Sequence, residues 1–214
     1  IYNGLVQLQN RGYDSAGITI IKNKSFITNK YASQSNKSAL EVLKNKHQYS
    51  NIGIGHTRWA THGAKTDINS HPHESFNGIF TIVHNGIIEN YQNLKSFLAS
   101  KGIESVSQTD TEIIANLLAY YYAENKNVEL SLKKLTEQLK GTWGLAILCI
   151  NEPNKIYCTR HGSPLLVGIE NDIVMITSEQ SGFCNLFNKY IVLNNQDICI
   201  LEYNENKHEI SIDT

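Results

Sequence analysis

The chain has 214 residues, of which 41% are hydrophobic, and its 19 basic and 20 acidic side chains give a formal net charge of −1. This length is enough to bury a sizeable core within one domain. Balanced charge argues against a nucleic-acid partner or an anionic membrane surface, because both select a basic protein surface. The longest strongly apolar run, Trp143 to Ile150, is too short to span a bilayer, so we expect a soluble protein.

The hydrophobic pattern predicts helices mainly in the middle of the chain, with most strands before and after them. Ile1, Leu5 and Leu8 share one face of a helix, and Thr109 followed by acids is typical of a helix start. In chain order we expect the end of a helix over 1–10, strands over 16–22 and 25–31, a helix over 36–46, strands over 51–57 and 79–85, helices over 89–101, 109–124 and 128–139, and strands over 143–150, 154–160, 164–169, 172–178, 190–193, 197–203 and 208–212.

This order differs from the regular βαβ alternation of a doubly wound fold. It favours an α+β domain with layered, largely antiparallel sheets covered by helices. No internal repeat and no linker rich in Pro, Gly or Ser divides the sequence, so we expect a single domain over residues 1–214.

The four cysteines show neither C-x-x-C pairing nor the spacing of a metal site. Cys149, Cys158 and Cys199 lie in apolar segments typical of strands, where cysteine usually behaves as a small buried hydrophobe. Cys184 lies in a segment typical of a loop. The pattern favours a reduced, cytoplasmic setting.

Five of the eight histidines lie between positions 56 and 84, alongside Gly53, Gly55, Gly63, Gly78 and Gly86. One hypothesis is a metal site built from His56, His62, His71, His73 and His84. The spacing does not support it, because no two of these histidines stand four apart on a predicted helix and Pro72 separates His71 from His73. We favour histidines that hydrogen-bond the backbone in tight loops, and we expect neither a metal nor a cofactor.

Three of the 19 basic residues are arginines, so the remaining 16 are lysines. Arg11, Arg58 and Arg160 all lie in turn-like segments that contain glycine. The planar guanidinium can hold a carboxylate with two parallel hydrogen bonds, which lysine cannot do. Arg160 is equally compatible with a structural ion pair. Asp110, at a predicted helix start, is favoured there by the helix dipole, or it binds an ammonium group and forms with arginine a clamp for an amino acid.

The tripeptide His84-Asn85-Gly86 ends a predicted strand with a sharp turn. The side-chain amide of Asn85 and the backbone N–H of Gly86 provide two donors that suit an oxyanion hole, although Asn-Gly is also a common turn dipeptide. The chain shows no G-x-S-x-G motif and no cysteine close to this stretch. The residues alone therefore indicate an amino-acid-sized pocket with a candidate oxyanion hole and no evident nucleophile.

Five ordered motifs resemble class II glutamine amidotransferases, and in particular the glutamine-hydrolysing domains of the glucosamine-6-phosphate synthase family. These are RGYDSAG at Arg11–Gly17, HTRWATHG at His56–Gly63, NSHPH at Asn69–His73, HNGIIENY at His84–Tyr91 and SQTDTEI at Ser107–Ile113. The resemblance implies the N-terminal-nucleophile fold, a four-layer αββα sandwich. It also implies hydrolysis of glutamine to glutamate and ammonia by the thiol of an N-terminal cysteine, whose own α-amine is the base.

The resemblance further assigns roles to the substrate-binding residues. Arg58 is expected to hold the α-carboxylate of glutamine, assisted by Thr61 and His71. Asp110 is expected to pair with the α-ammonium group. Trp59, in a mobile loop that runs to about Thr66, is expected to cover the site and to gate the passage of ammonia.

The same resemblance assigns the catalytic residues. Asn85 and the amide of Gly86 are expected to form the oxyanion hole. Arg11 is expected to steady the N-terminal strand and the nucleophile.

The N-terminal cysteine of the family is absent from this chain, and we expect it upstream of Ile1, at the start of a strand that precedes the first helix. The chain alone is therefore expected to be inactive. Sugar-phosphate isomerase domains that bind fructose 6-phosphate are expected after Thr214, and the full-length protein is expected to form a homodimer. Two alternatives stay open: an inactive glutamine-sensing module, and the glutaminase domain of another amidotransferase, such as the phosphoribosyl type.

Overall fold

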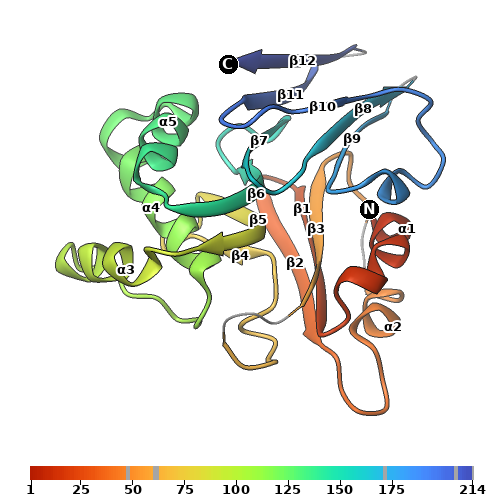
Figure 1. Cartoon of the computed structure of the whole chain (residues 1–214), viewed down its shortest axis with the longest axis horizontal. Helices are drawn as coiled ribbons and strands as arrows, with labels where there is room; N and C mark the ends of the chain where they lie inside the picture. Colours follow the sequence, from red (N-terminus) through yellow and green to blue (C-terminus); the bar gives the residue numbers. More distant parts are fainter. Residues whose placement is uncertain (47–48, 60–62, 171–172, 205–206, 214) are drawn as a thin grey trace.

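The computed structural model describes residues 1–46, 49–59, 63–170, 173–204 and 207–213 (Figure 1). Within these ranges every pair of neighbouring strands is antiparallel. The sheets have the strand orders β12-β11-β7-β6-β5-β4, β2-β1-β3 and β10-β8-β9. None of the helices described is long and apolar enough to cross a membrane.

The helices and short 3₁₀ turns have the following bounds: α1 Tyr2–Gln7, η1 Gln9–Arg11, α2 Ala39–Leu43, α3 Tyr91–Ser100, α4 Asp110–Asn125, α5 Val128–Gln138 and η2 Gln180–Phe183. The strands are β1 Ser15–Lys22, β2 Ser25–Ala32, β3 Gly53–Arg58, β4 His73–Glu74, β5 Phe80–Ile88, β6 Gly141–Cys149, β7 Lys155–His161, β8 Leu166–Glu170, β9 Ile173–Thr177, β10 Tyr190–Val192, β11 Ile198–Asn204 and β12 Lys207–Asp213.

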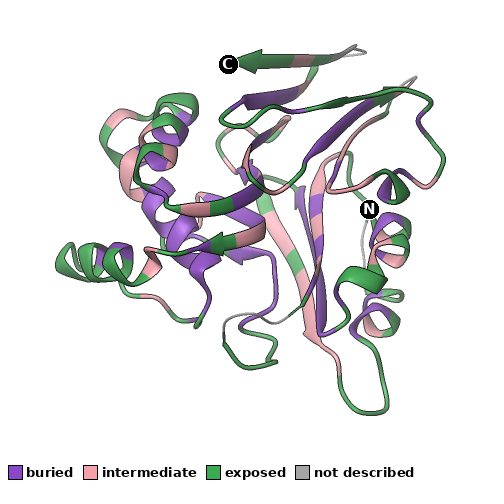
Figure 2. Ribbon diagram, viewed as in Figure 1, coloured by how far each residue is buried: buried purple, intermediate pink, exposed green. Residues whose placement is uncertain are grey.

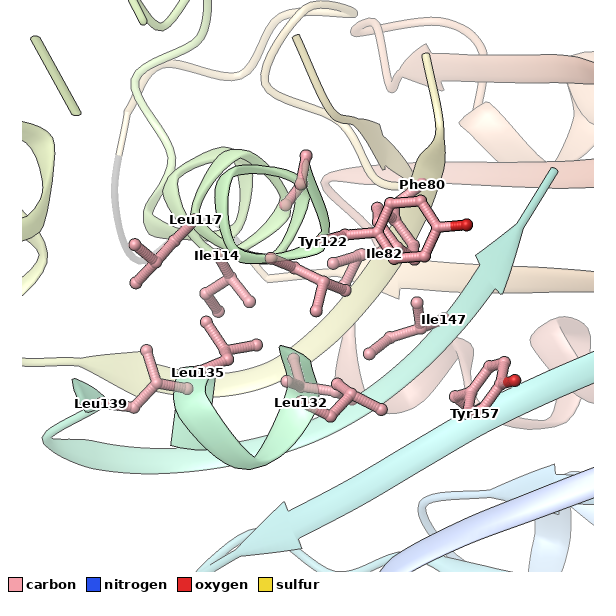
Figure 3. Close-up of a cluster of buried hydrophobic side chains, with 14 of the residues drawn as sticks. Phe80, Ile82, Ile114, Leu117, Tyr122, Leu132, Leu135, Leu139, Ile147 and Tyr157 are labelled. Carbon is pink, nitrogen blue, oxygen red and sulfur yellow. The ribbon is translucent and has the colours of Figure 1, made fainter. Parts of the chain in front are cut away.

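The largest core lies between the six-stranded sheet and the helices α3, α4 and α5. Side chains of α4 and α5, among them Ile114, Leu117 and Leu135, pack against Ile82 of β5 and Ile147 of β6 (Figure 3). α4 is buried around most of its surface (Figure 2), which explains why it is apolar without a clear polar face. Truncating one of these side chains to alanine typically costs about 2–5 kcal/mol of stability.

A second core lies between the sheet β2-β1-β3 and the six-stranded sheet. Ile21 of β1 and Ile54 of β3 pack against Val83 of β5 and Leu148 of β6. On the outer face of the sheet β2-β1-β3, α1 and α2 cover a third cluster that includes Leu5 and other apolar side chains. The order of layers is therefore helices, sheet, sheet, helices, and the prediction of an α+β fold of the αββα type is confirmed.

The sheet β10-β8-β9 packs on the six-stranded sheet through Val167, which contacts the cluster around Cys158 and Cys199. Among the described strands, β3 pairs only with β1 and β9 only with β8. Between these two edges runs a groove of about 420 Å³, lined by β3, β9, α1 and the middle of β5. Its walls include Gly53, Gly55 and Met175.

Several predicted boundaries were wrong. The helix predicted over 36–46 is only α2, which starts at a capping box formed by Ser38 and Glu41. The strand predicted to end at a sharp turn instead runs on to Ile88, so Asn85 and Gly86 lie inside β5, opposite Gly144 and Trp143 of β6. Gly86 has a φ of +135°, and a Cβ there would lie 2.2 Å from the Thr142 carbonyl oxygen. Only glycine fits this position.

Candidate functional site

A polar pocket of about 170 Å³ lies where β3, β5 and the start of α4 meet. Seven of the eight residues to which the family resemblance assigns roles line it, and the eighth, Thr61, lies outside the described residues. The seven are Arg11, Arg58, Trp59, His71, Asn85, Gly86 and Asp110. Residues far apart in the chain therefore converge on one small cavity.

Asp110 is fixed in this pocket by the start of α4. Thr109 caps the helix, its hydroxyl accepting a hydrogen bond from the Glu112 N–H at 3.4 Å. The Ile88 N–H at the end of β5 donates to Asp110 Oδ2 at 2.9 Å. The carboxylate is buried at the positive end of the helix dipole, where negative charge is stabilised.

Arg58 brings a buried positive charge to the same pocket. It is the last residue of β3, and its side chain is only 4% exposed. Burial lowers the pKa of the Arg58 guanidinium, and the charges of Asp110 and Asp14 oppose that shift. A guanidinium and a carboxylate that line one cavity match the carboxylate and ammonium of a free amino acid.

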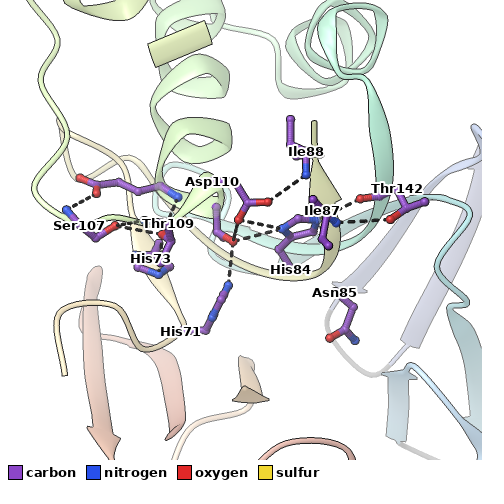
Figure 4. Close-up of polar contacts among 12 residues, drawn as sticks. His71, His73, His84, Asn85, Ile87, Ile88, Ser107, Thr109, Asp110 and Thr142 are labelled. Atoms are coloured by element: carbon purple, nitrogen blue, oxygen red, sulfur yellow. Dashed lines mark hydrogen bonds and ion pairs between the residues drawn. The ribbon is translucent and has the colours of Figure 1, made fainter. Parts of the chain in front are cut away.

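Thr111 is a buried residue that sequence reasoning missed, and its hydroxyl lies among His71, His84 and Asp110, which Figure 4 labels. Its hydroxyl is 2.8 Å from His71 Nε2 and 3.1 Å from His84 Nδ1, and it donates to Asp110 Oδ1 at 3.4 Å. His84 Nε2 lies 3.3 Å from the Thr142 carbonyl oxygen. The available signal was the place of Thr111 within SQTDTEI, immediately after Asp110.

The imidazoles of this region pack against one another, one pair tilted and one pair edge to face. The His56 and His71 rings are 4.4 Å apart, and the His71 and His73 rings 4.9 Å apart. Burial is the main cause that lowers the pKa of His56 to about 4 and places those of His71 and His73 well below the usual range. Among the described residues no group of His, Cys, Asp or Glu is arranged to hold a metal ion, and His62 lies outside them.

These histidines mostly bond to side chains, which corrects the expectation of backbone contacts in tight loops. His56 Nε2 lies 2.9 Å from Asn85 Oδ1, and His73 Nε2 lies 3.1 Å from the Thr109 hydroxyl. His56 and Asn85 line both the polar pocket and the groove between β3 and β9. The two cavities therefore meet at the candidate oxyanion hole.

The rim of the pocket is more exposed. Arg11 donates to Glu179 Oε2 at 2.9 Å, and both side chains keep a third or more of their surface in solvent. Trp59 is 56% exposed and packs edge-on against Tyr13, with ring centroids 5.4 Å apart. Lys65 forms an ion pair with Asp14 beside them.

Arg160 lies outside the pocket and has a structural role. It donates to the carbonyl oxygens of Leu193 at 2.9 Å and Gly162 at 3.2 Å, so it ties two loops together rather than forming an ion pair.

The cysteines also lie elsewhere in the fold. Cys149, Cys158 and Cys199 are buried among apolar side chains, as predicted, and Cys184 is half-buried in a loop. None of the four lines the polar pocket as described.

Known proteins with a similar sequence belong to one family. Residues 56–185 match the family model described as a glutamine amidotransferase domain. The chain is 41% identical over 202 residues to the glutamine–fructose-6-phosphate aminotransferase (isomerizing) of Caldanaerobacter subterraneus subsp. tengcongensis, a match that covers 94% of this chain and 33% of that protein. It is also 41% identical over 216 residues to a probable glutamine–fructose-6-phosphate aminotransferase (isomerizing) of Acanthamoeba polyphaga mimivirus, with coverage of 98% and 35%. The chain spans about a third of the length of these curated relatives.

Solved structures agree on the fold. The glutamine phosphoribosylpyrophosphate amidotransferase from B. subtilis aligns with a TM-score of 0.80 at 23% identity, over 98% of this chain and 45% of that one. A glutamine aminotransferase class-II domain protein from Silicibacter pomeroyi aligns with a TM-score of 0.63 at 12% identity, over 92% and 90% of the two chains.

Proposed function

We propose, from the fact that this chain belongs to the glutamine amidotransferase family, that it is the part of a longer enzyme that hydrolyses glutamine to glutamate and ammonia. The observation that carries the proposal is the meeting of Arg58, Asp110, Asn85 and Gly86 in one pocket. The first two offer opposite charges for the ends of an amino acid. The other two offer donors for a carbonyl oxygen that becomes negative during acyl transfer.

In the proposed complex, Arg58 binds the α-carboxylate of glutamine, with His71 and Thr61 assisting, and Asp110 binds the α-ammonium group. The side-chain carboxamide then extends towards Asn85 and Gly86. Holding both charged groups fixes the position of the α-carbon and therefore limits where the reacting carbonyl can lie. This is how positioning lowers the barrier of a later covalent step.

The proposed nucleophile is the thiol of a cysteine that precedes Ile1, as the family resemblance implies. The groove between β3 and β9 supports this placement, because it is open to an extended segment and reaches Asn85 and Arg11 at the polar pocket. The free α-amine takes the thiol proton as sulfur bonds to the carboxamide carbon. The carboxamide C–N bond then breaks, the amine returns the proton to the departing nitrogen, and water hydrolyses the thioester to glutamate.

Arg11 and Trp59 have accessory roles in this proposal. Arg11 lines both cavities and is held by Glu179, so it is placed to steady the segment that carries the nucleophile. Trp59 stands at the rim, where it covers bound glutamine and directs ammonia away from solvent.

The proposed acceptor of the ammonia is fructose 6-phosphate, which gives glucosamine 6-phosphate in the full-length protein. The support is the printed name of relatives that are 41% identical to this chain. Their greater length leaves room for sugar-phosphate isomerase domains, and we propose a homodimer for the full-length protein. For the phosphoribosyl alternative, the solved structure above gives support at the level of the fold, at 23% identity.

The test is a glutaminase assay on the full-length protein, with and without fructose 6-phosphate. We expect glutamate to form, and to form faster when the sugar phosphate is present. Glutamine binding without any glutamate would support the sensing module instead. Stimulation by phosphoribosyl pyrophosphate, and not by fructose 6-phosphate, would reassign the acceptor.

A further inference from the structure

His56 joins the two sheets at the candidate oxyanion hole. It lies on β3 of the sheet β2-β1-β3, and its Nε2 is 2.9 Å from Oδ1 of Asn85 on β5 of the six-stranded sheet. In Figure 4 the Asn85 side chain points away from His84 and Asp110. In the part of the chain that the structure describes, it is His56 that forms a hydrogen bond with the Asn85 side chain.

The chemistry of the two groups fixes the direction of this bond. A carboxamide oxygen only accepts hydrogen bonds, so His56 Nε2 carries the proton and donates it. Burial keeps the pKa of His56 near 4, so the neutral ring has this one N–H. The bond occupies the oxygen of Asn85 and leaves its NH₂ group as the end that can serve a ligand.

The ring of His56 is itself held in place. It is 9% exposed and packs in a tilted arrangement against His71, whose own Nε2 lies 2.8 Å from the Thr111 hydroxyl. The donor is therefore fixed before a substrate arrives. Preorganised donors of this kind contribute most to the stabilisation of a developing oxyanion.

We propose that His56 is a positioning residue of the glutaminase reaction, which holds the Asn85 amide with its NH₂ group towards the oxyanion. This inference rests on the proposed function. Without the His56 donor, the amide can rotate and present its carbonyl oxygen to the developing negative charge. In that orientation the carbonyl oxygen of Asn85 repels the oxyanion, which its NH₂ group would otherwise attract.

The test compares four variants of the full-length protein: His56→Leu, His56→Gln, Asn85→Ala and the double variant His56→Leu/Asn85→Ala. We expect His56→Leu to lower kcat about 10- to 100-fold with little change in the KM for glutamine. His56→Gln should recover most of the rate, because its side-chain amide nitrogen can occupy the place of Nε2 and donate. The double variant should be no slower than Asn85→Ala alone.

A matched control is His73→Leu, which removes another buried imidazole, one whose hydrogen bond goes to Thr109. In a double variant, the fold loss in kcat from His73→Leu should multiply with the loss from Asn85→Ala. The loss from His56→Leu should not multiply with it. If His56→Leu and Asn85→Ala multiply, or if Gln restores no activity, His56 does not act through Asn85. If the parent forms no glutamate, or Asn85→Ala is as fast as the parent, the proposed function or its oxyanion assignment fails instead.

Discussion

The pocket has two regions of different construction. The inner wall, formed by His84, Asn85, Asp110 and Thr111, stands on β5 and α4. Buried hydrogen bonds join Thr111 to His84 and Asp110, and a hydrogen bond from His56 holds Asn85. The rim, formed by Arg11, Tyr13, Trp59 and Glu179, is more exposed, and its contacts include the ion pair of Arg11 with Glu179 and the ring contact of Tyr13 with Trp59. The difference teaches that the groups closest to the proposed chemistry are preorganised, while the rim can adjust around a substrate.

The largest effect is expected from Asp110→Asn in the inner wall. It removes the buried charge proposed to bind the α-ammonium, which typically costs about 2–5 kcal/mol, or about thirtyfold or more in kcat/KM. The measurement is steady-state glutaminase kinetics of the full-length protein. Glutaramate, which is glutamine without its α-amino group, is the matched control substrate. Its turnover should be little affected, and an equal loss for both substrates would remove Asp110 from this role.

The next effect is expected from Thr111→Val. Valine keeps the shape but leaves the imidazole nitrogens of His71 and His84 without the hydroxyl they share, at a cost of about 2–4 kcal/mol in the free energy of unfolding. Calorimetry of the full-length protein should show a lower Tm, whereas Thr111→Ser should stay close to the parent. Equal Tm values for Val and Ser would show that this hydroxyl does not organise the wall.

Acid should weaken the region behind the inner wall through its neutral histidines. The pKa of His56 is lowered to about 4 in the folded state, and those of His71 and His73 are also lowered, against about 6.5 in the unfolded chain. Between these values the unfolded chain binds more protons, so stability falls as the pH drops from about 6.5 towards 4. His56 alone accounts for about 3 kcal/mol over that window. Urea unfolding midpoints at several pH values should fall less steeply for His73→Leu, and identical slopes would contradict the assignment.

The smallest effect is expected at the rim, from Glu179→Gln. The ion pair with Arg11 is substantially exposed, and pairs of this kind contribute about 0–1 kcal/mol. The change in kcat/KM should stay below about fivefold and should shrink further at high salt. A loss as large as that of Asp110→Asn would erase the distinction between rim and inner wall.

Much of this site could be predicted from sequence because its residues lie in short motifs. The chemistry of Arg58, Asp110 and Asn85 can be inferred from residue type and local setting. The backbone conformation of Gly86 could not be predicted. Glycine is required there because the Thr142 carbonyl on the neighbouring strand lies where a side chain would be. The hydrogen bond between His56 and Asn85 was hidden for the same reason, since it depends on how two sheets pack. Helices with strong caps, such as α4, were placed well, while α2 was overextended because its polar flanks suit a helix equally well.

The interlayer core of Ile21, Ile54, Val83 and Leu148 has a consequence for the timing of activity. Arg58 and His56 belong to one sheet, whereas Asn85 and Asp110 belong to the other sheet and its helix. A chain whose sheets have not yet docked therefore has two half-sites and no complete one. If the proposed glutaminase function holds, the release of ammonia is therefore coupled to folding, because the complete pocket exists only after the two sheets have docked.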